Sequence, residues 1–142
     1  MTRCNSILAK YMWLIPVVWS INNGKRSKRD IAASLGVSRR FVSSALYHMR
    51  MTGLIDENGK LDVSCNSINI KRRGRWFSCI IGGTVIVVHL TRRRAHYYTI
   101  PRKTLEKAVV NGCQESSKLC NRINKALSIL GKIGLEGAGL EE

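Results

Sequence analysis

The segment of residues 31–50 constrains the fold more than any other part of the chain. Its apolar positions recur at helical spacing and are interrupted by Gly36, a residue type that readily adopts the left-handed backbone that ends a helix. The positions that carry the pattern are Ile31, Ala32, Leu35, Gly36, Val37, Val42 and Ala45. Ala32 is small enough to let two helices approach closely. This spacing predicts two short helices packed together through a tight turn.

Serine residues stand where both of these helices are expected to begin. Ser27 is the expected cap of the first helix, over residues 30–35. Ser38 is the expected cap of the second helix, which runs to about Thr52 and ends at Gly53. Further upstream, a longer apolar helix is expected to start at Asn5 or Ser6, run toward residue 21 and be kinked by Pro16.

Polar and basic side chains occupy the second helix wherever its apolar face does not. They are Ser38, Arg39, Arg40, Ser43, Ser44 and Tyr47. Arginine can donate two hydrogen bonds to O6 and N7 of guanine, and serine can contact base edges or phosphates. Positive charge is unfavourable at a helix N-terminus, so Arg39 and Arg40 indicate an external anion. Tyr47 is open to two interpretations, because it either faces nucleic acid or packs on the segment that follows.

A β-hairpin is expected directly after this helix. Asn58-Gly59 separates two short apolar stretches within residues 54–63, a strong hairpin signal. This order of elements resembles the winged helix-turn-helix family of DNA-binding proteins, in particular transcription regulators of archaea and their viruses. The resemblance covers about residues 5–65 and implies that the helix beginning at Ser38 lies in the major groove. Lys28 before the first helix and Lys60 at the hairpin tip are either phosphate contacts or ordinary solvated charges.

A basic antiparallel β region is expected over residues 66–101. Strands are predicted at 67–71, 76–81, 84–90 and 96–100, with Gly82-Gly83 joining the middle pair. Between the first two strands a basic turn is predicted over residues 72–75, and Arg72, Arg73 and Arg75 are candidate DNA contacts. A second basic run, Arg92 to Arg94, follows the third strand. The aromatic residues Trp76, Tyr97 and Tyr98 either stack on bases or are half-buried sheet residues, and the second interpretation is favoured.

The charge of the chain indicates a polyanionic partner. There are 24 Lys and Arg against 9 Asp and Glu, a formal charge of +15, and no acidic residue occurs between Asp62 and Glu106. So large an excess repels itself in a compact fold, and nucleic acid is its commonest partner. Double-stranded DNA is the favoured partner, and RNA is the alternative because the arginine-rich β region exceeds what a small operator needs.

The cysteines and histidines give little support for a metal site or for catalysis. None of the five cysteines forms a CxxC pair, so buried free thiols are expected, with Cys65–Cys79 or Cys113–Cys120 as alternative disulfides. Cys79 with His89 or His96 would be a nucleophile pair, but Cys79 lies in an apolar run where thiols are usually inert. His48 is expected on the surface of the second helix. No enzymatic activity, cofactor or metal is predicted.

The C-terminal part, residues 102–142, is expected to be helical over 104–111 and 115–132. An apolar stripe at Leu119, Ile123, Ala126, Leu127 and Leu130 predicts a dimerisation element, and a homodimer would suit a palindromic DNA site. No apolar run reaches the roughly 20 residues of a membrane helix, and no leader cleavage site follows the N-terminal run. These features predict a cytoplasmic, nucleoid-associated protein without a membrane partner.

The expected fold is α+β, in three parts. Residues 1–65 are predicted as a winged helix-turn-helix, 66–101 as a small antiparallel β region and 102–142 as C-terminal helices. The predicted function is a sequence-specific double-stranded DNA-binding transcription regulator. The alternative is an RNA-binding or ribosome-associated basic protein that uses the winged helix as a scaffold.

Overall fold

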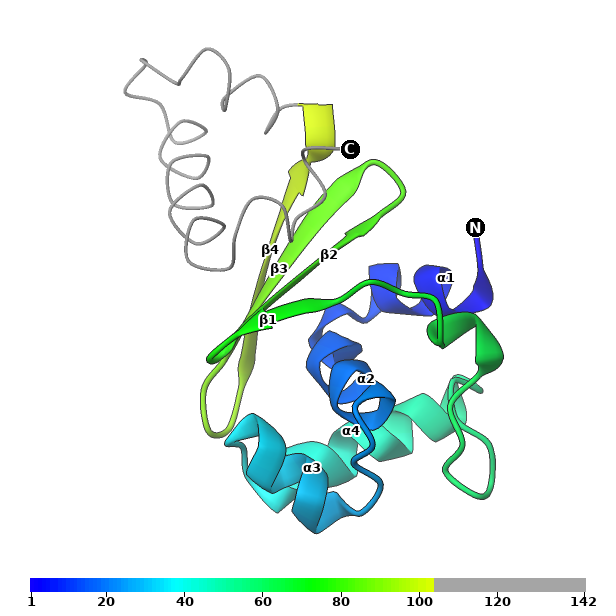
Figure 1. The fold of residues 1–142 in the computed structure, drawn as a ribbon, viewed down its shortest axis with the longest axis vertical. Helices are drawn as coiled ribbons and strands as arrows, with labels where there is room; N and C mark the ends of the chain where they lie inside the picture. Colours follow the sequence, from blue (N-terminus) through cyan, green and yellow to red (C-terminus); the bar gives the residue numbers. More distant parts are fainter. Residues whose placement is uncertain (104–142) are drawn as a thin grey trace.

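A computed structural model describes residues 1–103 of the chain. Its helices are α1 (Arg3–Lys10), α2 (Ile15–Asn22), α3 (Lys28–Leu35) and α4 (Arg39–Met51), with short 3-10 turns η1 (Met12–Leu14) and η2 (Val63–Cys65). Its strands are β1 (Lys71–Arg73), β2 (Trp76–Ile81), β3 (Thr84–Leu90) and β4 (Ala95–Pro101). Figure 1 shows the helices grouped beside the sheet. The expected α+β class is confirmed. The predicted C-terminal helices, the dimerisation stripe and the Cys113–Cys120 pair lie outside the described residues.

The N-terminal helix is broken, which corrects the expected single kinked helix. Thr2, and not Asn5 or Ser6, caps α1, because its hydroxyl accepts the Asn5 N–H at 3.1 Å. The chain bends by 111° between α1 and the Met12–Asn22 segment. Pro16 lies in the first turn of α2, where a missing N–H costs no helical hydrogen bond. The proline therefore marks the start of a second helix and not a kink within one.

No single helix within residues 1–103 is both long and apolar enough to cross a bilayer. The segments Arg3–Lys10 and Met12–Asn22 pass the test of length and composition only when they are joined across their bend.

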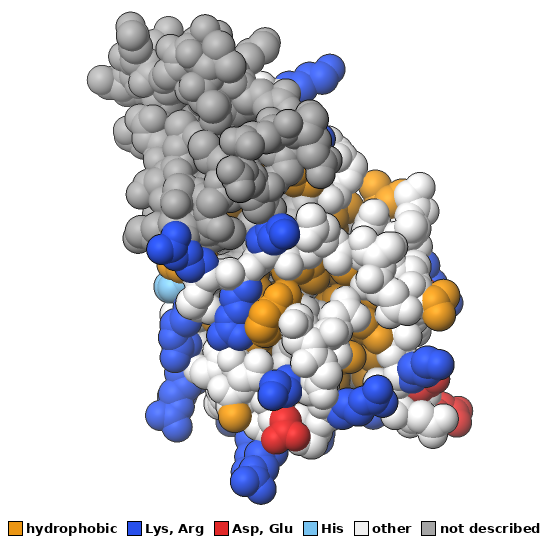
Figure 2. Space-filling view, viewed as in Figure 1, with side chains coloured by type: hydrophobic (Ala, Val, Ile, Leu, Met, Phe, Trp, Pro, Cys, Tyr) orange, Lys and Arg blue, Asp and Glu red, His pale blue; other side chains and the backbone are white. Residues whose placement is uncertain are grey.

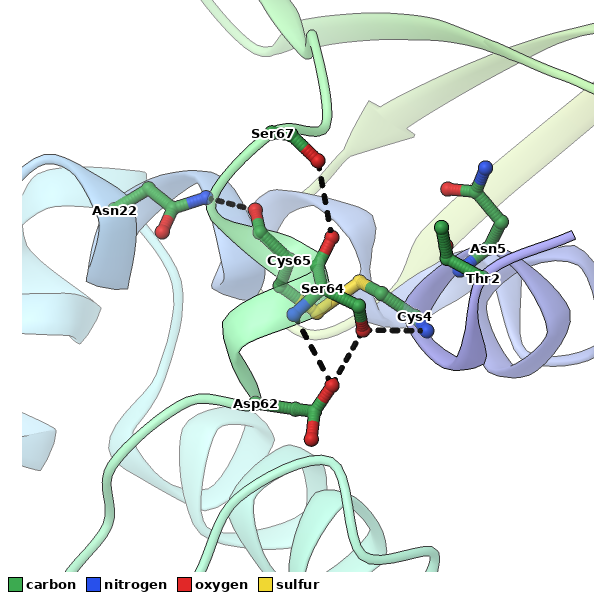
Figure 3. The surroundings of a disulfide bond; sticks show 8 residues. All are labelled: Thr2, Cys4, Asn5, Asn22, Asp62, Ser64, Cys65 and Ser67. Carbon is green, nitrogen blue, oxygen red and sulfur yellow. Dashed lines mark hydrogen bonds between the residues drawn. A yellow bond between two sulfur atoms is a disulfide. The ribbon is translucent and has the colours of Figure 1, made fainter.

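A disulfide joins the two ends of the helical part. It links Cys4 in α1 to Cys65 in η2, across 61 positions of sequence, and both residues are fully buried. The expectation of buried free thiols is therefore wrong for Cys4 and Cys65, and so is the alternative pair Cys65–Cys79. It is confirmed for Cys79, a free, buried thiol in β2. Around the disulfide (Figure 3), the Cys4 N–H donates to Ser64 Oγ at 3.0 Å. Asn22 Nδ2 donates to the Cys65 carbonyl at 2.9 Å, so α1, α2 and η2 meet at one point.

The disulfide is expected to contribute substantially to stability. Closing a loop of this length removes conformational freedom from the unfolded chain, so the double variant C4A/C65A should lower the free energy of unfolding by about 2–4 kcal/mol. Denaturant unfolding with and without a thiol reductant measures this. The wild type should lose stability on reduction, and the double variant should be insensitive to the reductant. An equal response of both proteins would assign the effect to other cysteines.

The segment after α4 forms a turn in place of the predicted hairpin. Its only strand-like pairing is an isolated bridge between Ile55 and Leu61. Asp56 organises the turn, because its Oδ1 accepts the N–H groups of Asn58 and Lys60, each at 2.9 Å. Asp62 then caps η2, so the chain leaves the extended conformation after Leu61 and continues to the disulfide. A second strand of useful length therefore has no room to form.

The sheet is antiparallel, with its four strands in the order β1-β2-β3-β4. The predicted β2–β3 hairpin is confirmed, with Gly82 at φ +61° in its turn, and β4 extends the predicted last strand by one residue at each end. The expected strand over 67–71 is wrong, because β1 begins only at Lys71. Arg72 and Arg73, expected in a turn, pair instead with Phe77 and Trp76. The preceding residues stay next to η2, where the Ile68 N–H donates to the Cys65 carbonyl.

One hydrophobic cluster unites helices and sheet. From the helical side it includes Leu8, Ile15, Ile31, Leu35, Val42 and Met49, and from the sheet Phe77, Cys79, Ile86, Val88 and Leu90. Residues on both sides of the predicted boundary at position 65 therefore share a core. The opposite face of the sheet is also buried, at Val85, Val87 and Ile100. Because the sheet shares its core with the helices, the turns at the ends of the strands have a defined position relative to the helices.

Candidate nucleic-acid interface

The pair α3–α4 forms through local hydrogen bonds that the sequence predicts. Ser27 Oγ accepts the Asp30 N–H at 3.1 Å and Ser38 Oγ accepts the Phe41 N–H at 3.2 Å, so both serines cap their helices as expected. Gly36 ends α3 in the left-handed conformation, with φ 67° and ψ 34°. The turn between the helices is thus only Gly36 to Ser38, and it places α4 directly after α3.

Helix α4 has one buried and one exposed face. Phe41, Val42, Ala45 and Met49 are buried against the core. The side chains of the other face are Arg39, Arg40, Ser44 and Tyr47, all exposed, and Ser43, half-buried. At about 100° per residue these positions form one continuous stripe along the helix. Tyr47 is 63% exposed, so it does not pack on the following turn, which was one of its two interpretations.

His48 departs from the expected surface position. Its ring lies 4.3 Å from the Tyr11 ring and 5.6 Å from the Trp13 ring, measured between centroids. Its Nε2 is buried and has no hydrogen-bond partner. His48 therefore packs α4 against the segment between α1 and α2, and it is not part of the exposed stripe.

A basic groove borders the stripe along the C-terminal half of α4. It encloses about 580 Å³ between the α2–α3 loop, α4 and the turn of residues 56–60. Lys28 and Lys60, which the sequence left as either phosphate contacts or solvated charges, line it together with Arg26. Arg50, which was not among the candidate residues, lines it too. Glu57 is the acidic residue in its lining. The structure thus brings two predicted cations to the same side of α4.

A second groove borders the stripe at the N-terminal end of α4. It encloses about 550 Å³ and is lined by Ser38, Arg40, Phe41, Ser44 and Arg93. Arg93 belongs to the turn between β3 and β4. The sequence showed a basic run there, but no local pattern indicates that this turn lies beside α4.

Figure 2 shows Lys and Arg side chains around the lower part of the molecule, where the helices lie, with few acidic ones.

Arg72 points into the protein, unlike the other candidate arginines. Its guanidinium carbon lies 4.6 Å from the Trp19 ring centroid and 5.1 Å from that of Phe77. Its Nη2 donates to the Ser34 carbonyl at 2.9 Å and its Nε to the Gly74 carbonyl at 2.7 Å. Burial, and then the neighbouring charge of Arg75, lower the pKa of Arg72. This side chain joins the sheet to α3, whereas Arg73 and Arg75 are exposed.

The remaining candidate groups of the sheet are held by neighbours. Trp76 stacks on His89, with ring centroids 4.0 Å apart. Cys79 is buried, and burial raises its pKa to about 12, so the thiol stays protonated at neutral pH. His89 and His96 are in register with Trp76 and therefore share its face of the sheet. Cys79 is three residues from Trp76 on β2, so its thiol faces the opposite side, because side chains alternate along a strand. Within residues 1–103, no group of three or more His, Cys, Asp or Glu could hold a metal ion.

Comparisons with protein-family models, with curated proteins and with solved structures each found no match. The function is therefore inferred from the site itself, namely the exposed stripe of α4 and the basic grooves on its two sides.

The inward position of Arg72 leads to a stability prediction. Arg72→Met removes two hydrogen bonds and the cation–π contacts with two aromatic rings, so it should lower the free energy of unfolding by about 1–3 kcal/mol. The neighbouring Arg73→Met is the control, since a change at an exposed position usually stays within about 0.5 kcal/mol. Chemical denaturation of both variants makes the comparison. Equal destabilisation of the two would mean that Arg72 does not join the sheet to α3.

Proposed function

We propose that the protein is a sequence-specific double-stranded DNA-binding transcription regulator that inserts α4 into the major groove. The observation that carries this proposal is the arrangement of the α4 stripe between two basic grooves. A major groove is about 12 Å wide and admits one α-helix, whose exposed side chains then meet the base edges. The phosphate backbones border that groove on both sides, where the cations of this protein lie.

The chemistry of the stripe supports base recognition. Arg39 and Arg40 offer planar guanidinium groups for guanine, and Ser43 and Ser44 are short donors and acceptors for other base edges or phosphates. Both arginines occupy the first turn of α4, where their charge opposes the helix dipole. A duplex would supply the negative charge that this helix end lacks. Tyr47, exposed further along the stripe, adds an aromatic surface that a base or sugar can meet.

The α3–α4 pair also supports the helix-turn-helix resemblance. Its Gly36 turn and its two serine caps match the local geometry that this motif requires. The short turn that carries Lys60 takes the place of a full wing. Under this proposal Lys28 and Lys60 contact the backbone and add affinity, whereas the stripe selects sequence. Such a role implies a location with the genome. A homodimer, expected from the apolar stripe in the sequence beyond residue 103, would match a palindromic site.

RNA binding is the alternative that the arginine-rich turns favour. Single-stranded RNA is usually held by aromatic side chains that stack on splayed bases. Of the three aromatic residues considered for that role, Trp76 already stacks on His89, and Tyr97 is the exposed one, at 51%. A duplex-reading helix therefore explains more of the surface than a stacking platform does.

The arginines of the stripe provide the first test of this proposal. The double variant R39A/R40A should weaken binding to the preferred duplex by about 1–3 kcal/mol for each bidentate hydrogen-bond pair that is removed, and should relax sequence preference. The double variant K10A/K103A removes the same charge from exposed positions that belong neither to the stripe nor to the two grooves. Binding is measured by fluorescence anisotropy on preferred and scrambled duplexes. If R39A/R40A retains the full preference, α4 does not read the bases.

Substitution of the lysines in the first groove should have a different effect on binding from substitution of the arginines of the stripe. K28A/K60A should weaken binding equally on preferred and scrambled duplexes, because phosphate contacts carry no sequence information. The slope of log K against log salt concentration should decrease by about 0.9 for each phosphate that is no longer neutralised. An unchanged salt slope would identify these lysines as ordinary solvated charges. A weaker sequence preference in K28A/K60A would contradict their assignment to the backbone.

A further inference from the structure

We propose that the end of the sheet next to α4 is a second DNA-binding element, which holds the phosphate backbone beside the N-terminus of α4. This sheet tip consists of two turns, Gly74–Arg75 between β1 and β2 and residues 91–94 between β3 and β4. The inference rests on the proposed function, since it requires a duplex positioned by α4. Figure 1 shows both turns at the end of the sheet that lies near α3.

The sheet tip is joined directly to the turn that starts α4. The Ser38 N–H donates to the Arg92 carbonyl at 2.8 Å. The Leu90 N–H donates to the Arg75 carbonyl at 2.9 Å, which ties the two turns of the tip to each other. The guanidinium of Arg75 lies against Gly36, with Nη2 2.9 Å from where a Cβ would stand. The tip therefore keeps a fixed position relative to the stripe of α4.

The turn of residues 91–94 is itself well organised. The Thr91 N–H donates to the Arg94 carbonyl at 2.9 Å, and the Arg94 N–H donates to Thr91 Oγ1 at 3.1 Å. The side chains of its three arginines, at positions 92–94, are exposed. A backbone ordered before binding loses little conformational entropy when its side chains meet a ligand. Three arginines held next to one another also repel, and an external anion relieves that repulsion.

The location of Arg93 specifies which part of the duplex the tip would meet. Arg93 shares a groove with Arg40 and Ser44 at the N-terminal end of α4. Lys28 and Lys60 share the other groove, which follows the C-terminal half of the same helix. With α4 in the major groove, the two sets of cations would therefore face different stretches of backbone. The exposed arginines at position 75, on the neighbouring turn, and at position 73, at the end of β1, extend the tip. The arginine at position 72 does not, because it points inward.

Phosphate is a better partner for the tip than an unpaired base. The charged side chains of the tip are all arginines, and no acidic residue occurs in the sequence between Asp62 and Glu106. Trp76, which follows Arg75 directly and was considered for base stacking, is stacked on His89. Arginine suits bidentate contact with phosphate oxygens, and such contacts position a protein on a duplex without reading its sequence.

The test compares two double variants of the full chain that each lack two positive charges. R93A/R94A removes side chains of the tip but retains the Arg92 carbonyl that accepts from Ser38. K10A/K103A is the control, with one lysine at the end of α1 and the other beyond β4, away from the tip. Each protein is titrated with the preferred duplex and with a scrambled duplex over a series of salt concentrations. Hydroxyl-radical footprinting on the preferred duplex records which backbone positions each protein protects.

R93A/R94A is expected to decrease the salt slope by about 1.8, at ~0.9 for each phosphate that is no longer neutralised, with sequence preference unchanged. Its footprint should lack protection on one side of the bound major groove, and R93K/R94K should restore both slope and footprint because charge is retained. Equal slopes for R93A/R94A and K10A/K103A, or an unchanged footprint, would overturn the inference while the reading role of α4 stands. An effect on RNA binding alone would also overturn it. A wild-type protein without preference among duplexes would overturn this inference and the proposed function together.

Discussion

The left-handed turn at Gly36 is the constraint on which the rest of the interface depends. It ends α3 and allows Ser38 to cap α4 after a single intervening residue. It also leaves space for the guanidinium of Arg75, because a side chain at this position would meet that group. The Ser38 N–H that emerges from the turn is bound by the Arg92 carbonyl. The three residues of this turn thus position both the helix pair and the sheet tip.

A second set of contacts holds the sheet behind the helices. The guanidinium of Arg72 lies over the rings of Trp19 and Phe77 and donates to the carbonyl of Ser34 in α3. At the other end of the helical part, the Cys4–Cys65 disulfide fixes α1 to η2. Together these contacts leave the exposed stripe of α4 on a rigid support, which is what recognition of base edges at fixed positions requires. In the proposed complex the basic grooves beside the stripe would contribute affinity, and the stripe would contribute selectivity.

The sequence predicted those parts of the fold that depend on neighbouring residues. Both serine caps, the Gly36 turn and the β2–β3 hairpin follow from local patterns, and the structure has them where they were expected. Some failures are local, as at Thr2 and Pro16 in the N-terminal helices, and others involve partners distant in sequence. Cys65 pairs with Cys4 and not with Cys79, the hairpin after α4 gives way to η2, and Arg72 turns toward α3. The disulfide and the direction of Arg72 could not be derived from spacing, because each joins elements that only the tertiary fold brings together.

The candidate site, like the fold, could be predicted from the sequence only in part. The stripe of α4 could be predicted, since helical periodicity determines which side chains share a face. The grooves could not be predicted, because they depend on the tertiary fold. One groove is lined by Lys28 and Lys60, and the other brings Arg93 next to Arg40. Arg93 was visible in the sequence only as part of a basic run between two strands. Long-range packing makes that run a neighbour of α4.

The central claim is that α4 reads the sequence of a DNA duplex. Selection of bound fragments from a random pool of double-stranded DNA tests it most directly, with a random RNA pool run in parallel under the same salt conditions. The wild-type protein is expected to enrich one family of duplexes that share a short conserved block, about as long as one major-groove contact. Recovery of duplexes without a common block, or enrichment from the RNA pool alone, would contradict it.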